Sequence, residues 1–175
     1  VGTGRVLDVG CGDSLFFSQL LGSGHQVCAI DLTPYSIARH PRLWYVLGDV
    51  TQAPFASNTF DYIIAISTLE HIAGIEAAAV RTVAELRRIL SPSGTLLITL
   101  PMCKGTNEYP FWRELIESAK RMRDLLMEGF EVVREEYYLA RVGETVCSLV
   151  SREAAAAADP QVDLIVAHLA LRRAL

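Results

Sequence analysis

The feature of this sequence that most limits its fold is a series of five short apolar runs, separated mostly by segments with helical periodicity. The runs are Arg5–Val9, His25–Ile30, Trp44–Leu47, Phe60–Ile66 and Thr95–Leu100. Strands that alternate with helices predict right-handed crossovers and a parallel sheet with helices on both faces. The nearly all-apolar run 60–66 is typical of a strand buried within such a sheet.

Segments with apolar residues at helical spacing lie between and after these runs. They cover 14–21, 33–39, 75–90 and 111–127. Gly22–Gly24 and Ser91–Gly94 end two of these segments, and Pro34 suits the first turn of a third.

The last part of the chain predicts an antiparallel edge. Phe130–Tyr138 and Glu144–Ser151 both suit strands, and no helix separates them. The sequence thus predicts an α/β fold: a doubly wound, mostly parallel seven-stranded sheet with an antiparallel final strand. Residues 1–175 contain no repeat or linker, which predicts a single domain.

Two segments follow the predicted antiparallel pair. For the alanine run Ala154–Ala158, a helix and a loose tail are both open. After Asp159-Pro160 we expect a helix to Leu175, because four apolar residues recur there at helical spacing. They are Val162, Ile165, Val166 and Leu169.

Composition excludes several classes of protein. Of the 175 residues, 51% are apolar and 21% charged, which is typical of a folded chain. The net charge of −4 argues against a nucleic-acid partner, which usually requires a basic face. The four cysteines form no C-x-x-C pair and suit free thiols in a reducing compartment. No run could span a membrane or act as a signal peptide, so we expect a cytoplasmic protein.

A loop with two glycines, Asp8-Val9-Gly10-Cys11-Gly12, follows the first predicted strand. In an open α/β sheet the ligand lies beyond the carboxyl ends of the strands, where glycine allows close approach. Two glycines alone suit a plain strand-to-helix turn equally well. Asp31 follows the loop by about twenty residues, where a carboxylate can accept hydrogen bonds from both ribose hydroxyls or cap a helix. Together they favour a ribose-containing ligand.

The loop also separates two nucleoside ligands. A dinucleotide site requires a third glycine beside its pyrophosphate, but Leu15 stands at that position and the next glycine is Gly22. Asp8 adds a negative charge, which is unfavourable near a pyrophosphate and favourable near an ammonium or a sulfonium. The residues therefore favour S-adenosylmethionine over NAD.

Five ordered motifs extend from the first predicted strand to the fifth. They are VLDVGCG at 6–12, AIDLTP at 29–34, Gly48-Asp49, FDYIIAISTLEHI at 60–72 and ELRRILSPSGTLLITLP at 85–101. This set resembles the class I S-adenosylmethionine-dependent methyltransferases, in particular the small-molecule group that includes ubiquinone-biosynthesis enzymes. The resemblance implies a Rossmann-like fold and methyl transfer to an O, N or C nucleophile of a small molecule.

The resemblance also implies which residues contact S-adenosylmethionine. Asp8 would act through water on its ammonium, Asp31 would hold the ribose, and Asp49 would accept from the adenine amino group. The full set is Asp8, Gly10, Cys11, Gly12, Asp31, Leu32, Asp49, Val50 and Ser67. The family's third loop glycine is Ser14 here, and its Lys-Pro-Gly-Gly turn reads Ser91-Pro92-Ser93-Gly94. Neither departure removes a charged contact.

Glu70 and His71 are the candidate catalytic residues, because they follow the fourth predicted strand and face the expected acceptor region. His71 suits a general base, since the pKa of histidine lies near working pH. Both residues are also consistent with bracing the following helix. Some relatives bind a divalent metal with Glu-x-x-Glu-His, but Ser67 replaces the first Glu, so we expect no metal.

The segment 101–112 is the expected wall of the acceptor site. Tyr109, Trp112 and Arg113 are the candidate substrate-binding residues, although aromatic side chains there suit core packing equally well. Few residues precede Val6, so three alternatives are open: an open site, a site covered by a partner or a second copy in a homodimer, or a trimmed segment.

Three other functions are open from the sequence. An NAD-dependent oxidoreductase would share the sheet and Asp31, but the glycine loop argues against it. A non-catalytic cofactor-binding or regulatory subunit requires only the binding half of the site. A methyltransferase acting on RNA or protein is disfavoured only by the net charge.

Overall fold

The computed structural model describes residues 3–13, 16–35, 40–72, 74–102, 110–141, 147–158 and 163–174. The strands are β1 (Arg5–Val9), β2 (Gln26–Asp31), β3 (Leu43–Leu47), β4 (Phe60–Ala65), β5 (Leu90–Met102), β6 (Phe130–Arg141), β7 (Ser148–Val150) and β8 (Asp163–Arg173). The helices are α1 (Phe16–Gly22), the 3-10 turn η1 (Val50–Gln52), α2 (Leu69–Ile72), α3 (Glu76–Ile89), α4 (Pro110–Gly129) and α5 (Arg152–Ala157).

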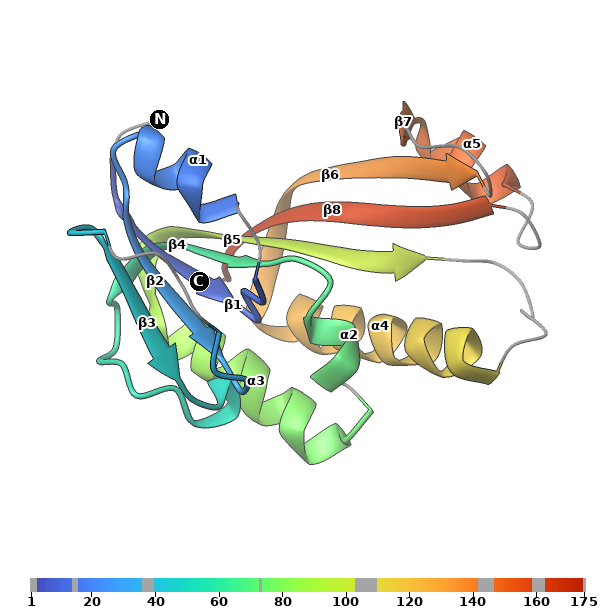
Figure 1. Cartoon of the computed structure of the whole chain (residues 1–175). Helices are drawn as coiled ribbons and strands as arrows, with labels where there is room; N and C mark the ends of the chain where they lie inside the picture. Colours follow the sequence, from blue (N-terminus) through green and yellow to red (C-terminus); the bar gives the residue numbers. More distant parts are fainter. Residues whose placement is uncertain are drawn as a thin grey trace.

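These strands form one mixed sheet in the order β3-β2-β1-β4-β5-β8-β6-β7 (Figure 1). Neighbours from β3 through β5 are parallel, whereas β8 is antiparallel to β5 and β6. The predicted fold class is therefore confirmed, with one strand more than the sequence indicates. The order reverses between β1 and β4, which makes the carboxyl ends of these strands the topological switch point.

Helices cover the two faces of the sheet unequally. Figure 1 shows α3 and α4 below the sheet and α1 above β1 and β2. The larger core packs Leu86 of α3 and Met122 of α4 on strand residues such as Ile63 and Leu96. The smaller core packs Phe17 and other α1 residues on β1, β2 and β4.

The prediction of a final helix is wrong, because residues 163–173 form strand β8. Ile165 and Leu169 fit a helical spacing, but they also alternate with Ala167 and Leu171, and all four are buried. β8 pairs along most of its length with β5 on one side and β6 on the other. These long-range pairings override a local preference for helix.

Other elements lie close to their expected positions. The antiparallel pair is confirmed, with Tyr137 opposite Val150 and Leu139 opposite Ser148. The alanine run belongs to helix α5, which Ser151 caps by accepting a hydrogen bond from the Ala154 amide. Of the expected helix 33–39, residues 36–39 lie outside the described residues, and 33–35 are not helical. Among the described residues, no helix is long and apolar enough to cross a membrane.

The assignment of β8 as a strand predicts how its residues tolerate truncation. Leu171 is fully buried and its neighbour Arg172 is exposed, as expected where side chains alternate between faces. We expect Leu171→Ala to lower the free energy of unfolding by about 2–5 kcal/mol. Arg172→Ala is expected to change it by less than about 0.5 kcal/mol. Urea denaturation of both variants checks this, and equal effects would contradict the alternation.

Candidate active site

The ends of β1 and β4 touch at the glycine loop. Gly10 has φ +66°, and a Cβ built on it would lie 2.4 Å from Cγ2 of Thr68, which follows β4. The Thr68 hydroxyl lies 3.1 Å from the Val9 carbonyl oxygen, within hydrogen-bonding distance. Only glycine meets both the backbone conformation and the contact at this position.

Gly12 and Asp31 meet across the ends of β1 and β2. The Gly12 amide donates to Oδ2 of Asp31 at 3.0 Å, and the Thr33 amide donates to Oδ1 at 2.9 Å. Each carboxylate oxygen can accept more than one hydrogen bond, so Asp31 retains acceptor capacity for a ligand. The loop and the acid that the sequence singles out are thus directly bonded.

Asp8 is the most strongly perturbed acid of this region. Its residue is only 5% exposed. Burial, and to a lesser extent the negative charge of Asp31, raises the pKa of Asp8 to about 6. A cation bound near the two carboxylates would relieve both effects.

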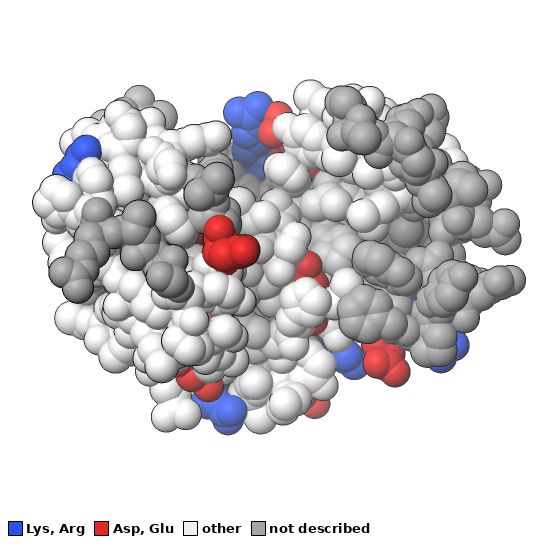
Figure 2. All heavy atoms as spheres, in the orientation of Figure 1, with Lys and Arg blue, Asp and Glu red and all other residues white. Residues whose placement is uncertain are grey.

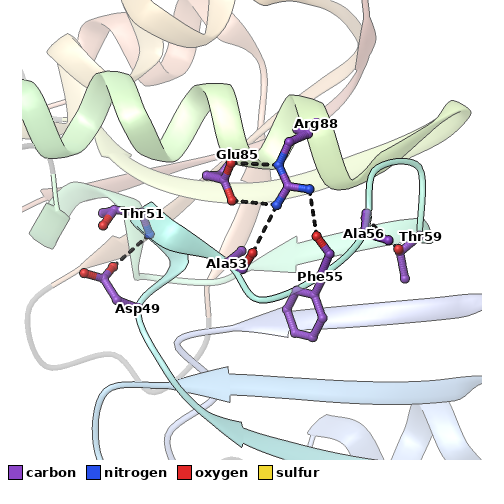
Figure 3. Close-up of polar contacts among 8 residues, drawn as sticks. All are labelled: Asp49, Thr51, Ala53, Phe55, Ala56, Thr59, Glu85 and Arg88. Atoms are coloured by element: carbon purple, nitrogen blue, oxygen red, sulfur yellow. Dashed lines mark hydrogen bonds and ion pairs between the residues drawn. The ribbon is translucent and has the colours of Figure 1, made fainter.

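Asp49 lies on a segment that α3 holds in place. Its carboxylate caps η1 by accepting a hydrogen bond from the Thr51 amide at 2.8 Å. Figure 3 shows the Arg88 guanidinium of α3 donating to the carbonyl oxygens of Ala53 and Phe55, at 3.0 and 2.7 Å, and to the Glu85 carboxylate. Arg88 thereby fixes the chain that follows Asp49.

A pocket of about 420 Å³ opens at the switch point. Seven of the predicted site residues line it: Gly10, Asp31, Leu32, Asp49, Val50, Ser67 and His71. Asp8, Cys11 and Gly12 are not among its lining residues, although the Gly12 amide holds Asp31, which is one of them. Its size is within the range of small-molecule sites.

Sequence reasoning missed several residues that line the pocket, including Thr51, Thr68, Ile72 and Ile75. Thr51 and Thr68 are uncharged and stand beside residues with stronger signals. Ile72 and Ile75 read locally as helix residues. Only the strand order places them together.

The comparison with known proteins agrees with this geometry. Residues 7–98, just over half of the chain, match the sequence profile of the methyltransferase domain family. The chain belongs to this family. A methyltransferase domain agrees with S-adenosylmethionine as the cofactor that the sequence motifs predict for this chain. The acid-lined pocket with apolar walls fits this nucleoside.

Individual named proteins match this chain at moderate sequence identity. Malonyl-[acyl-carrier protein] O-methyltransferase of Erwinia pyrifoliae is 32% identical over 81% of this chain and 55% of its own length. Demethylmenaquinone methyltransferase of Beutenbergia cavernae is 31% identical over 54% of this chain and 39% of its own length. The chain thus spans about half of these relatives or less.

Solved structures share the fold of the methyltransferase domain. A phosphoethanolamine N-methyltransferase of Haemonchus contortus, in complex with phosphomonomethylethanolamine and S-adenosylhomocysteine, superimposes with a TM-score of 0.67 at 17% identity. The match covers 98% of this chain and 49% of that one. The PH0226 protein of Pyrococcus horikoshii gives 0.65 at 18% identity, covering 96% and 82%.

Glu70 and His71 of the methyltransferase domain point to different environments. His71 is exposed and lines the pocket. Glu70 is only 3% exposed, and its Oε2 has no hydrogen-bond partner among the described residues. Burial raises the pKa of Glu70. Of the two predicted catalytic residues, His71 therefore has access to a ligand in this pocket.

The predicted acceptor-binding residues are described only in part. Tyr109 and the side chain of Trp112 lie outside the described residues. Arg113 is exposed on α4 and does not line the pocket.

Within the ranges given above, no group of three His, Cys, Asp or Glu residues could hold a metal ion. Cys11, Cys28 and Cys147 are free thiols.

The raised pKa of Asp8 predicts a conflict between stability and binding. Between pH 3.8 and about 6 the folded state binds more protons than the unfolded state, so the free energy of unfolding falls as pH rises. Above about pH 6 the ionised carboxylate costs about 2–3 kcal/mol. We expect Asp8→Asn to be more stable by that amount at pH 7.5 and unchanged near pH 3.5, measured by urea denaturation. It should also bind S-adenosylmethionine more weakly. A variant that neither gains stability nor loses affinity would contradict this role of Asp8.

The Arg88 contacts predict that this residue positions Asp49. Arg88→Met removes both hydrogen bonds to the carbonyl oxygens, and we expect about tenfold weaker S-adenosylmethionine binding by calorimetry. Glu85→Gln is the matched control, because it leaves those two bonds in place and removes the charge of a partly exposed ion pair, while the amide oxygen of Gln can still accept from the Ala53 backbone. Equal losses in the two variants would show that the ion pair alone matters.

Proposed function

We propose that this chain is a single-domain methyltransferase that moves the methyl group of S-adenosylmethionine to an O, N or C nucleophile of a small molecule. The observation that carries the proposal is one pocket at the switch point lined by Gly10, Asp31 and Asp49. Its position beyond the carboxyl ends of β1, β2 and β4 is the usual ligand position in open α/β sheets.

The pocket divides the binding task among named groups. The carboxylate of Asp31, already oriented by the Gly12 and Thr33 amides, would accept from the ribose hydroxyls. The carboxylate of Asp49 is oriented by the Thr51 amide and would accept from the adenine amino group. Leu32 and Val50 supply apolar surface for the ring. Asp8 and Asp31 together provide the negative field that favours a cation.

The reaction requires little covalent chemistry from the residues of the protein. The cofactor supplies a methyl group that a positively charged sulfur already activates, so the residues mainly align acceptor and donor. Ser67 and His71 line the side of the pocket formed by the end of β4 and α2, where an acceptor would approach. We propose His71 as a base for an acceptor whose proton leaves early.

The choice of a small-molecule acceptor rests on charge and on the named relatives. The net charge is −4, and the described residues on the face in Figure 2 show scattered acidic and basic side chains without an extended basic patch. Two relatives are named as methyltransferases of malonyl-[acyl-carrier protein] and of demethylmenaquinone. A cytoplasmic location and a homodimer are further parts of the proposal, and sedimentation would test the dimer.

Calorimetry with S-adenosylmethionine, S-adenosylhomocysteine and NAD tests the proposal. We expect binding of the first two and none of NAD. Asp31→Asn removes one charged hydrogen-bonding group and should weaken S-adenosylmethionine binding about 10–100-fold. Asp124→Asn, at an exposed position on α4, is the matched control and should bind like the wild type. Tight binding of NAD without binding of S-adenosylmethionine would contradict the proposal.

The role of His71 is tested by turnover. Labelled S-adenosylmethionine is incubated with separate pools of metabolites, peptides and RNA, and we expect label in the metabolite pool. For that product, His71→Ala should lower the rate about 100-fold, as the loss of a general base does. Its affinity for S-adenosylhomocysteine should stay within about twofold of wild type. Full turnover by His71→Ala would leave this residue without a catalytic role.

A further inference from the structure

The loop that follows β2 is held by hydrogen bonds more than by packing. Leu32 is 73% exposed and Thr33 is exposed as well, so burial contributes little to fixing either residue. Asp31, at the start of the loop, is anchored through its backbone, because the Gly48 amide donates to its carbonyl oxygen at 2.9 Å. Thr33, two residues further along, requires an anchor of its own.

Tyr45 of β3 supplies that anchor. β3 lies beside β2 at the edge of the sheet, with Tyr45 opposite Ala29 (Figure 1). The Tyr45 hydroxyl donates a hydrogen bond to the carbonyl oxygen of Thr33. The Tyr45 ring is half-buried against the smaller core, which includes residues of α1, so the hydroxyl extends toward the loop from a packed side chain.

The surroundings of the Tyr45 hydroxyl keep its proton in place. Burial has the largest effect and raises the pKa of this phenol, and the negative charge of Asp31 adds to the increase. The backbone amide of Tyr35 has an opposing effect, because a donor beside the oxygen favours the phenolate. A phenol that keeps its proton at neutral pH remains a donor to the Thr33 carbonyl oxygen.

A continuous path of hydrogen bonds therefore leads from β3 to the pocket. The Tyr45 hydroxyl holds the Thr33 carbonyl group, and the Thr33 amide holds Oδ1 of Asp31 at 2.9 Å. The Gly12 amide holds the other carboxylate oxygen of Asp31. A binding group keeps its orientation only when the residues that support it are themselves fixed. The orientation of the Asp31 carboxylate thus depends on Thr33 staying in place.

We propose that Tyr45 is a positioning residue of the cofactor site: its hydroxyl fixes the loop 31–33, so that the Asp31 carboxylate is oriented toward the ribose hydroxyls. This rests on the proposed methyltransferase function, in which Asp31 binds the ribose. Tyr45 is not among the residues that line the pocket, so it acts through Thr33 and not through contact with the ligand. Packing against the smaller core requires only the ring of Tyr45, which makes the role of the hydroxyl separable by mutation.

Calorimetry of the whole chain with S-adenosylhomocysteine tests this role. Tyr45→Phe removes the hydroxyl and keeps the ring, and we expect about three- to tenfold weaker binding, the usual effect of losing one hydrogen bond. The midpoint of urea denaturation should stay close to that of the wild type, because the lost bond lies at an exposed loop. An affinity equal to that of the wild type would overturn the role of Tyr45.

Tyr62→Phe is the matched control, because it makes the same chemical change against the same core. Tyr62 of β4 packs on the smaller core, and a Cβ built on Gly4 would lie 3.1 Å from its ring. Gly4 precedes β1, so Tyr62 lies at the amino end of that strand, whereas the pocket lies at the carboxyl end. We expect wild-type affinity in this variant. An equal loss in both variants would assign the effect to the core and overturn the proposal.

A double-mutant cycle with Asp31→Ala separates positioning from a general effect on the fold. Alanine has no oxygen for the Thr33 amide to orient, so adding Tyr45→Phe to Asp31→Ala should weaken binding by less than about twofold further. Two independent, multiplying losses would overturn the path through Thr33. These outcomes concern Tyr45 alone, whereas wild-type protein that binds neither S-adenosylmethionine nor S-adenosylhomocysteine would overturn the proposed function, and this inference with it.

Discussion

The contact between Gly10 and Thr68 is the constraint on which the rest of the site depends. It joins the ends of β1 and β4 at the point where the strand order reverses, with no room for a side chain on Gly10. The loop that follows β1 turns toward β2, where the Gly10 amide donates to the Ile30 carbonyl oxygen at 2.9 Å. That turn brings the Gly12 amide to Asp31. A single close approach thus sets both the floor of the pocket and the orientation of its central carboxylate.

The buried negative charges of the site lower the stability of the protein when no ligand is bound. Asp8 is buried near Asp31, and its ionised form is disfavoured by desolvation and by repulsion. In a protein without a ligand this arrangement lowers the free energy of unfolding, because neutral side chains of the same shape would pack equally well. The cost becomes useful only when a cation binds, since the attraction is then strongest where water has been excluded. Stored electrostatic strain of this kind is typical of functional sites.

The parts of this structure that the sequence predicts are those that depend on local order along the chain. Each parallel strand ends in a residue with a recognisable task, such as Asp31 or Asp49, so the pocket could be anticipated from strand ends alone. β8 could not, because Ile165 and Leu169 satisfy a period of 3.6 as well as a period of 2, and alanine between them fits either. The pairing with β5 and β6 decides between the two periods. Thr68 was missed for the same reason, since its importance comes from Gly10, far away along the chain.

The strand misread from the sequence also lies behind one edge of the cofactor pocket, next to β5. As a helix, residues 163–173 would offer no partner to Thr99 and no neighbour to Glu136. As β8, they place His168 between both, one strand away from each. Ser67 lies at this edge: its φ of 49° is unusual for a residue other than glycine, and its amide donates to the Thr99 hydroxyl of β5. The backbone at the end of β4 is therefore held by β5 at a residue that lines the cofactor pocket.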